Sequence, residues 1–135
     1  MSTKIFVNLP VKNLDKSKAF FASLGYTFNA QFTDETAACM VISEDIYAML
    51  LTEDKFRQFT PRPLSDANKA TEVLVCLSAE SRDKVNDLVD KAMAAGASNV
   101  MPPMDYGFMF GRSFADLDGH IWEIMWMDPA AVQPS

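Results

Sequence analysis

The sequence predicts an α+β fold made of two tandem βαβββ modules, and three features support this prediction. Strand-like alternation opens both halves of the chain, as KIFVNLPV at residues 4–11 and as TEVLVCLS at residues 71–78. An amphipathic helical segment follows each of them and ends at a glycine, Gly25 or Gly96. Each half then finishes with strand segments that a tight turn connects. The same order of elements therefore occurs twice.

The first module begins with a strand that has two different faces. The aliphatic side chains of residues 4–11 alternate with Phe6 and Asn8, so these two lie on the opposite face of the strand. Asn13 is a suitable N-cap for the helix that ends at Gly25. Further strands are predicted at residues 26–34, 37–43 and 46–53.

The second module repeats this order with a longer helix and a longer loop. The helix is predicted within residues 79–96, and one or two strands lie within residues 99–116 around a proline-broken loop. The last strand, HIWEIMW at residues 120–126, is entered through an Asp-Gly hairpin turn. We therefore divide the chain into a first module (residues 1–57), a linker (58–69), a second module (70–128) and a C-terminal tail (129–135).

Composition and charge exclude several classes of protein. The chain has 135 residues, 49% of them hydrophobic, and a net charge of -6. This charge opposes nucleic-acid binding, and no apolar run is long enough for a membrane span or a signal peptide. Cys39 and Cys76 lie in apolar segments, so we expect both to be reduced, buried core thiols. The sequence thus predicts a cytoplasmic protein that binds neither nucleic acid nor membranes.

Matching the two halves indicates which positions of the first strands are equivalent. Alignment of the aliphatic alternation pairs Val7 with Val73. In this alignment, Phe6 corresponds to Glu72. Both positions are expected on the strand face that points away from the helices.

The closing strands are matched through their turns. Alignment of the turn at Glu44 with the turn at Asp118 pairs Met49 with Glu123. These two positions are also expected on the face away from the helices. A sheet that helices cover on one side only must bury or use its other side. We therefore expect the free faces of the two modules to form a trough.

Two stretches carry a family resemblance that covers nearly the whole chain. LPVKNLDKSKAFFASLGY spans the first strand and helix, and FADLDGHIWEI spans the last turn and strand; both resemble the vicinal oxygen chelate superfamily. This superfamily includes glyoxalase I, bleomycin- and fosfomycin-resistance proteins, and extradiol dioxygenases. The resemblance implies that the two modules form a glyoxalase/bleomycin-resistance/dioxygenase-type half-barrel trough.

The resemblance also implies a divalent metal ion in the trough, bound by residues at equivalent points of the two modules. The corresponding residues are Phe6, Met49, Glu72 and Glu123. Only Glu123 matches the usual ligand type, because histidine is expected at Phe6 and Glu72 and glutamate at Met49. Zinc, nickel or iron sites need three or four donors, whereas two carboxylates hold magnesium or manganese weakly. A divalent metal ion therefore stays an alternative, and no cofactor is assigned.

Glu72 and Glu123 are the candidate catalytic residues. If no metal separates them, two facing carboxylates would retain a proton near neutral pH and could act as general acid and base. The alternative is that one of them points to solvent at the mouth of the trough. His120 is the only histidine and begins the last strand, and we interpret it as a turn residue rather than a proton carrier.

The ligand-binding residues are expected to be mainly apolar. The loop PPMDYGFMFGRS is predicted to close one end of the trough, with aromatic faces and, in Arg112, a cation for a carboxylate or phosphate group. The alternative is that Phe108 and Phe110 point into the core and only Tyr106 is accessible. The complete candidate set is Phe6, Asn8, Met49, Tyr106, Phe108, Phe110, Arg112 and Met125.

Two functions fit these features. The first is a small-molecule-binding protein with a degenerate metal site, which holds a flat, partly apolar ligand. The alternative is a metal-dependent lyase, isomerase or dioxygenase, similar to glyoxalase I, with a sparse carboxylate site. A purely structural interaction module is a third hypothesis. Because the superfamily usually pairs subunits, we expect a homodimer, either side by side or with exchanged modules.

Overall fold

The computed structural model describes residues 2–131, so residues 132–135 of the predicted tail lie outside the described residues. The chain divides into two compact units, Met1–Asp66 and Ala67–Ser135. This division falls inside the predicted linker. No helix within the described range is long and apolar enough to cross a membrane.

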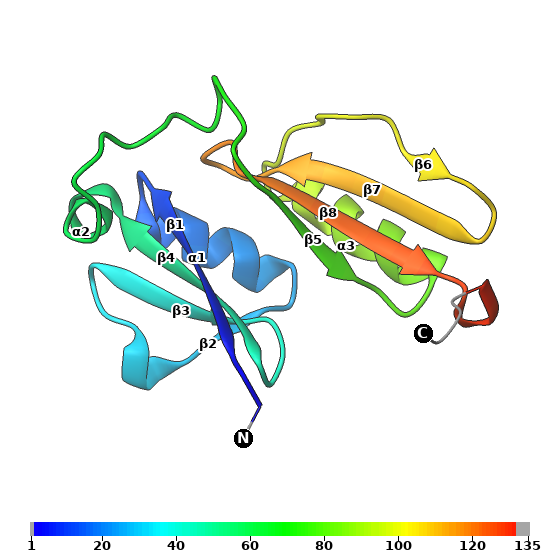
Figure 1. Cartoon of the computed structure of the whole chain (residues 1–135), viewed down its shortest axis with the longest axis horizontal. Helices are drawn as coiled ribbons and strands as arrows, with labels where there is room; N and C mark the ends of the chain where they lie inside the picture. Colours follow the sequence, from blue (N-terminus) through cyan, green and yellow to red (C-terminus); the bar gives the residue numbers. More distant parts are fainter. Residues whose placement is uncertain (1, 132–135) are drawn as a thin grey trace. The chain divides into compact units, whose positions relative to one another are not determined.

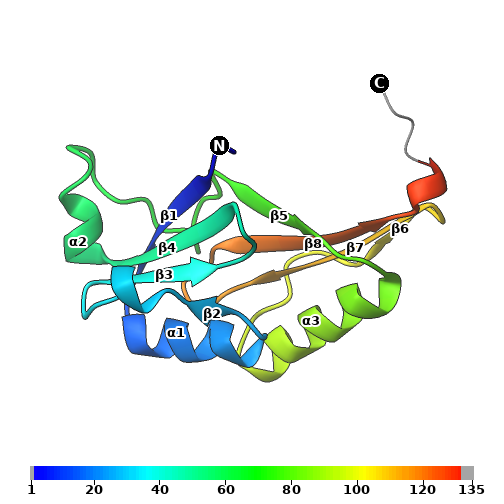
Figure 2. The same ribbon diagram turned by 90° about the horizontal axis from the view of Figure 1, so that it is seen from below.

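Unit 1 has the predicted order of elements (Figure 1). They are β1 (Ile5–Val11), α1 (Leu14–Ser23), β2 (Thr27–Phe28), a 3-10 helix (Ala30–Phe32), β3 (Ala37–Val41), β4 (Ile46–Thr52) and α2 (Glu53–Arg57). The strand order in the sheet is β1-β4-β3-β2, with β1 parallel to β4 and the other pairs antiparallel. Within this unit, α1 lies along one face of the sheet (Figure 2).

Burial in unit 1 follows the alternation seen in the sequence. Leu9 of β1 and Leu50 of β4 are register partners, and both are buried together with Phe21 of α1. The helix begins where predicted, because the Asn13 side chain accepts a hydrogen bond from the Lys16 N–H at 3.0 Å. These contacts place the core of unit 1 between α1 and the sheet.

Unit 2 repeats the architecture. Its elements are β5 (Leu74–Ser78), α3 (Arg82–Ala94), β6 (Met104–Asp105), β7 (Met109–Ala115), β8 (Ile121–Met127) and a 3-10 helix (Pro129–Ala131). The strand order is β5-β8-β7-β6, with β5 parallel to β8. α3 lies along one face of this sheet (Figure 2) and buries Val85 and Val89 there, with Trp122 and Ile124 of β8. The predicted α+β class with two βαβββ modules is confirmed.

One predicted strand is shorter than expected. The sequence predicts a strand over residues 26–34, but only Thr27–Phe28 pair with β3. The Asn29 side chain accepts a hydrogen bond from the Gln31 N–H at 3.0 Å and starts a 3-10 turn instead. Short amide side chains offer the backbone such local bonds in competition with a strand ladder.

The two cysteines differ in burial. Both thiols are free, and Cys39 is buried as predicted. The prediction that Cys76 is buried is wrong, since Cys76 is exposed. Its neighbours Val75 and Leu77 point toward α3, so Cys76 points to the face of β5 that no helix of unit 2 covers.

The predicted alignment of the closing strands is confirmed. β3 pairs Cys39 with Met49, and β7 pairs Ser113 with Glu123. In the alignment of the turns, Met49 corresponds to Glu123. Cys39 then corresponds to Ser113, because both pairs of residues have the same separation in the sequence. Met49 and Glu123 are therefore equivalent positions.

The predicted alignment of the first strands is wrong. β1 pairs Asn8 with Met49, and β5 pairs Cys76 with Glu123. Because Met49 and Glu123 are equivalent, Asn8 and Cys76 are equivalent too. The predicted alignment, which pairs Val7 with Val73, is therefore out of register by two residues, which is one full period of the strand alternation.

The helix N-caps support the corrected alignment, because Asn13 and Ser81 are separated by the same length of chain as Asn8 and Cys76. The equivalent of Phe6 is therefore Leu74, and Glu72 precedes β5. The error has a simple physical origin. Side chains of a strand alternate with a period of two, so a match of apolar positions cannot distinguish alignments that differ by one period.

Candidate functional site

Unit 2 contains a pocket of about 370 Å³ on the side of its sheet that α3 does not cover. A volume of this size lies in the usual range of small-molecule sites. Residues from β5, β6, β7 and β8 line the pocket together with residues from the segments that lead into β5 and β6. The lining residues are Thr71, Leu74, Met101, Pro102, Met104, Gly111, Arg112, Ser113, Ile121, Glu123 and Met125.

The alternation of β8 places a carboxylate in this pocket. Trp122 and Ile124 are both buried on the α3 side at 1% exposure, so Glu123 between them points to the opposite face. Its neighbours across the sheet are Cys76 of β5 and Ser113 of β7. A glutamate in this apolar strand is therefore a polar group at the floor of an open, apolar face.

Glu123 is half-buried, and its carboxylate makes no hydrogen bond or ion pair with residues 2–131. Its charge still acts on the neighbouring thiol. Although Cys76 is exposed as a residue, partial desolvation of its sulfur raises the pKa of the thiol above its usual value, and the negative charge of Glu123 raises that pKa further. A thiol that ionises with difficulty is a poor nucleophile at neutral pH. The available polar group of this site is thus the carboxylate.

We expect iodoacetamide to alkylate Cys76 but not Cys39 in the folded protein near neutral pH, because Cys39 is 1% exposed and Cys76 is exposed. The Glu123→Gln variant should react faster at Cys76, since the substitution removes one of the two causes that raise the thiol pKa. Mass spectrometry of the labelled peptides measures both rates. Equal rates in the two proteins would contradict the electrostatic contact.

Arg112 does not present its guanidinium to the pocket. Its side chain has the same parity as the buried Phe114 and points toward α3. There, Nη1 donates to Asn86 Oδ1 at 3.0 Å and to Asp90 Oδ1 at 2.9 Å. The prediction that Arg112 offers a cation to an anionic ligand is corrected accordingly, because the helix already binds this group.

The aromatic residues of the loop also depart from the predicted site. Phe110 faces α3, where the Arg82 guanidinium lies 5.1 Å from the ring centroid. Tyr106 and Phe108 are 61% and 49% exposed, so the alternative that Phe108 enters the core is wrong. None of the three aromatic rings lines this pocket, whereas Met125 does.

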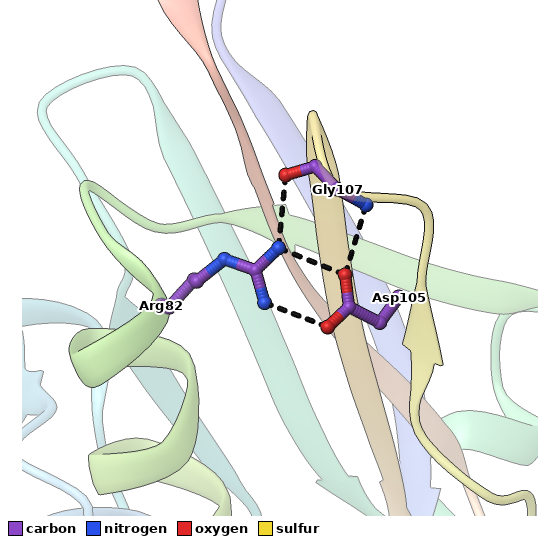
Figure 3. A network of polar contacts seen from close by, with 3 residues as sticks. All are labelled: Arg82, Asp105 and Gly107. Atoms are coloured by element: carbon purple, nitrogen blue, oxygen red, sulfur yellow. Dashed lines mark hydrogen bonds and ion pairs between the residues drawn. The ribbon is translucent and has the colours of Figure 1, made fainter.

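An ion pair fixes the loop that carries these aromatic residues (Figure 3). Arg82, the first residue of α3, donates from both Nη atoms to the Asp105 carboxylate and from Nη2 to the Gly107 carbonyl, each at 2.8 Å. The Gly107 N–H donates to Asp105 Oδ1 at 2.9 Å, and its φ of 80° favours glycine. The Arg82–Asp105 clamp therefore ties the start of α3 to the chain beyond β6.

The Asp105 carboxyl is expected to titrate at a pH of about 2. Hydrogen bonds from Arg82 and then from the Gly107 N–H lower its pKa from 3.8 to about 2. Because the folded-state pKa lies below the unfolded value, the ion pair stabilises the folded loop above pH 3.8, and this contribution is lost as the pH falls through about 2. In an Arg82→Met variant, the carboxyl titration followed by NMR should move back toward 3.8. An unchanged midpoint would show that the clamp does not form in solution.

In unit 1, the candidate residues Phe6, Asn8 and Met49 lie on the sheet face away from α1, as the alternation predicts. Asn8 and Met49 are register partners, and the Asn8 amide donates to the Phe6 carbonyl at 3.3 Å. The Phe6 ring stacks on Tyr47 with 4.8 Å between ring centroids. A role of these residues in ligand binding stays a prediction.

Glu72, the second candidate catalytic residue, is exposed and lies outside β5. It does not line the pocket, and the register partner of Glu123 is Cys76 instead. A catalytic pairing of Glu72 with Glu123 stays a prediction. His120 lies in the turn before β8, where its backbone N–H donates to Asp116 Oδ1 at 3.0 Å, which agrees with its interpretation as a turn residue.

The residues at the positions implied for a metal ion do not fit a divalent cation. In the corrected alignment they are Phe6, Met49, Leu74 and Glu123, which supply one carboxylate and one thioether. Zinc, nickel and iron sites use three or more N, O or S donors, and a neutral thioether suits softer ions. Within residues 2–131, no group of three or more His, Cys, Asp or Glu side chains could hold a metal.

Sequence reasoning missed the aliphatic wall of the pocket. Leu74, Met101, Pro102 and Met104 line it, and none of them was a candidate. The separation of the helix N-caps contains the signal for Leu74. No such signal exists for the segment before β6, because periodicity does not predict where the side chains of an irregular segment point.

Comparisons with known proteins agree with this architecture. Residues 3–43 match the model of the bleomycin resistance protein-like N-terminal family. A search of curated proteins found no match.

Solved structures are similar over nearly the whole chain. The structure of hypothetical protein SA1046 from S. aureus has 27% sequence identity and a TM-score of 0.78, with 93% of this chain and 95% of that chain covered. A glyoxalase/bleomycin resistance protein/dioxygenase family enzyme from Burkholderia phytofirmans PsJN has 14% identity and a TM-score of 0.76, with 93% and 99% covered. The fosfomycin resistance protein FosX from Listeria monocytogenes has 16% identity and a TM-score of 0.65, with 93% of each chain covered.

The duplicated βαβββ order and these similarities define the fold class of the chain. The chain has the glyoxalase/bleomycin resistance/dioxygenase fold, as the resemblance to the vicinal oxygen chelate superfamily predicts. Within that class, its first module carries the bleomycin resistance protein-like N-terminal match. The fold hosts binding proteins and enzymes alike, so the function must be argued from the site.

Proposed function

We propose that this chain binds apolar small molecules in the pocket of unit 2 without the help of a metal ion. The observation that carries the proposal is the chemistry of the pocket walls. Leucine, isoleucine, proline and three methionines surround one carboxylate in a volume of about 370 Å³. Small-molecule sites typically combine such apolar walls with a few polar groups that orient the ligand.

The walls also indicate the type of ligand. The sequence predicts aromatic faces and a flat ligand, but the rings of Tyr106, Phe108 and Phe110 do not line the pocket. Methionine side chains are flexible and polarisable, so they adapt to ligands of irregular shape. We therefore expect the site to accept alkyl groups as well as flat rings.

Thermal-shift measurements in EDTA test the proposal. A panel of small apolar alcohols and amines should raise the melting temperature of the chain, because a ligand that binds only the folded state stabilises it. The shift should be the same with and without added divalent ions. A diverse panel that gives no shift would contradict the proposal.

A metal-dependent lyase, isomerase or dioxygenase is the competing function. Its carboxylate site depends on Glu72 together with Glu123, and the corrected alignment puts Leu74 in the place of Glu72. Elemental analysis of the purified protein separates the two functions. Near-stoichiometric zinc, nickel, iron or manganese would favour the enzyme.

We also propose that the protein is a cytoplasmic homodimer. The free cysteines suit a reducing compartment, and the tendency of the superfamily to pair its subunits supports the dimer. Light scattering in dilute solution should give twice the mass of the chain. The mass of a single chain would contradict the dimer.

A further inference from the structure

We infer that the pocket of unit 2 selects amphipathic monocations, which are molecules with one ammonium or guanidinium group on an apolar body. Glu123 would bind the cationic group, and the aliphatic walls would bind the body. This inference rests on the proposed function and adds to it the charge of the ligand.

Glu123 carries a charge that no residue in the range 2–131 compensates. Among the described residues that line the pocket, it is the only carboxylate. No hydrogen bond or ion pair joins it to any residue in the range 2–131. The one cationic residue of this described lining, Arg112, is engaged by Asp90 and Asn86 on the other side of the sheet.

Glu123 is half-buried between apolar side chains, where water screens a charge less than it does in open solvent. A ligand cation can form a charge-assisted hydrogen bond with this carboxylate, which is stronger than a bond from a neutral donor. The setting therefore discriminates between a cation and a neutral group of the same shape.

Few other polar groups lie on the described wall of the pocket. Apart from Glu123 and the occupied Arg112, the described lining offers only the hydroxyl groups of Thr71 and Ser113. Ser113 is the register partner of Glu123, so the two side chains leave the sheet on the same face, and the hydroxyl can accept a second hydrogen bond from an ammonium group. The carboxylate of Glu123 and the hydroxyl of Ser113 can therefore both accept hydrogen bonds from one cationic group on an otherwise apolar wall.

The charge of the whole chain also favours a cationic ligand. A net charge of -6 attracts cations to the protein and repels anions. An anionic ligand would meet both this field and the carboxylate of Glu123. The site should therefore reject carboxylates that have the same apolar body.

Calorimetric titrations with three probes of equal chain length test the inference: n-octylamine, 1-octanol and octanoate, all in EDTA at neutral pH. The amine is protonated under these conditions, like a lysine side chain. For the unaltered protein, we expect the amine to bind roughly ten- to a hundredfold more tightly than the alcohol. Octanoate should bind more weakly than the alcohol.

Two variants assign the preference to the pocket. Glu123→Gln should abolish the preference for the amine and leave the affinity for the alcohol within about threefold of its original value. Glu80→Gln is the matched control, because Glu80 is an exposed glutamate of unit 2 outside the pocket and its replacement changes the net charge equally. This control should keep the preference.

The outcomes separate the inference from the proposed function. Equal binding of amine and alcohol, or a preference that survives in Glu123→Gln, overturns the inference and leaves the proposed function intact. If none of the three probes binds, both are overturned.

Discussion

Replacing Asp116 with alanine is expected to lower the free energy of unfolding by about 3 kcal/mol or more, because it removes the acceptor of three N–H hydrogen bonds. Asp116 is 6% exposed and lies at the turn before β8. Its Oδ1 accepts hydrogen bonds from the backbone N–H groups of Asp118 and His120, and its Oδ2 accepts one from Trp122 Nε1, all at 3.0 Å. Alanine would leave the turn without its central acceptor.

Burial raises the pKa of Asp116, although His120 and the three donors act in the opposite direction. The side chain is thus held in place by its hydrogen bonds at the cost of desolvation. Trp122 is among the largest buried side chains of unit 2. In Asp116→Ala, its indole N–H would lose the hydrogen bond to Asp116 Oδ2 in this core. A loss of this size is a large part of the stability of an ordinary domain.

Urea denaturation measures this effect. Asp116→Asn should be less harmful than Asp116→Ala, because it keeps one carbonyl oxygen for the backbone donors. Asp87→Ala is a suitable control, since Asp87 is exposed on α3, and it should change stability by no more than about 0.5 kcal/mol. If Asp116→Ala were as stable as this control, the hydrogen-bonded turn would not support the fold as described.

Replacing Gly111 with valine is expected to weaken ligand binding by tenfold or more while the chain still folds. Gly111 lies on β7 opposite Met125 on β8, and a Cβ at Gly111 would overlap the sulfur of Met125. The thioether must then swing away from the strand, and both residues line the pocket. Overpacking of this kind costs about 1–3 kcal/mol. If this cost appears in the free energy of ligand binding, the affinity falls by roughly ten- to a hundredfold.

A second substitution tests this explanation. Met125→Ala in the Gly111→Val background removes the displaced thioether and should recover part of the affinity for 1-octanol. Two substitutions that share a contact are expected to be non-additive in this direction. An additive loss would show that valine acts through the backbone and not through Met125. Circular dichroism of each variant confirms that the fold is retained.

Much of the fold could be predicted because two independent periodicities agree. The alternation of β1 and β8 and the capped helix after β1 fix the elements, their faces and their order. The closing hairpins could be aligned correctly because turns mark single positions. The first strands could not, because alternation does not detect a shift by one full period. The N-caps Asn13 and Ser81 contain the missing information, since a cap also marks a single position.

The site was only partly predictable for a different reason. The direction of Glu123 and Met125 could be predicted because strand parity decides it. Arg112 follows the same parity rule and points to α3, but the sequence does not show that Asp90 lies there. Pairing between a strand and a helix distant in the chain depends on how the two pack. Tyr106 and Phe108 flank Gly107, which the Arg82–Asp105 clamp holds, and this clamp joins residues that no local pattern connects.

The most direct test of metal-free binding in this pocket is an NMR titration of the protein labelled at its methionine methyl groups, with n-octylamine in EDTA. We predict that the methyl resonances of Met101, Met104 and Met125, which line the pocket, shift on binding. The resonance of Met40, which is fully buried in unit 1, should stay in place. Metal-free binding in this pocket would be contradicted if the resonances shifted only after a divalent ion is added, or if the shifts occurred at methionines other than these three.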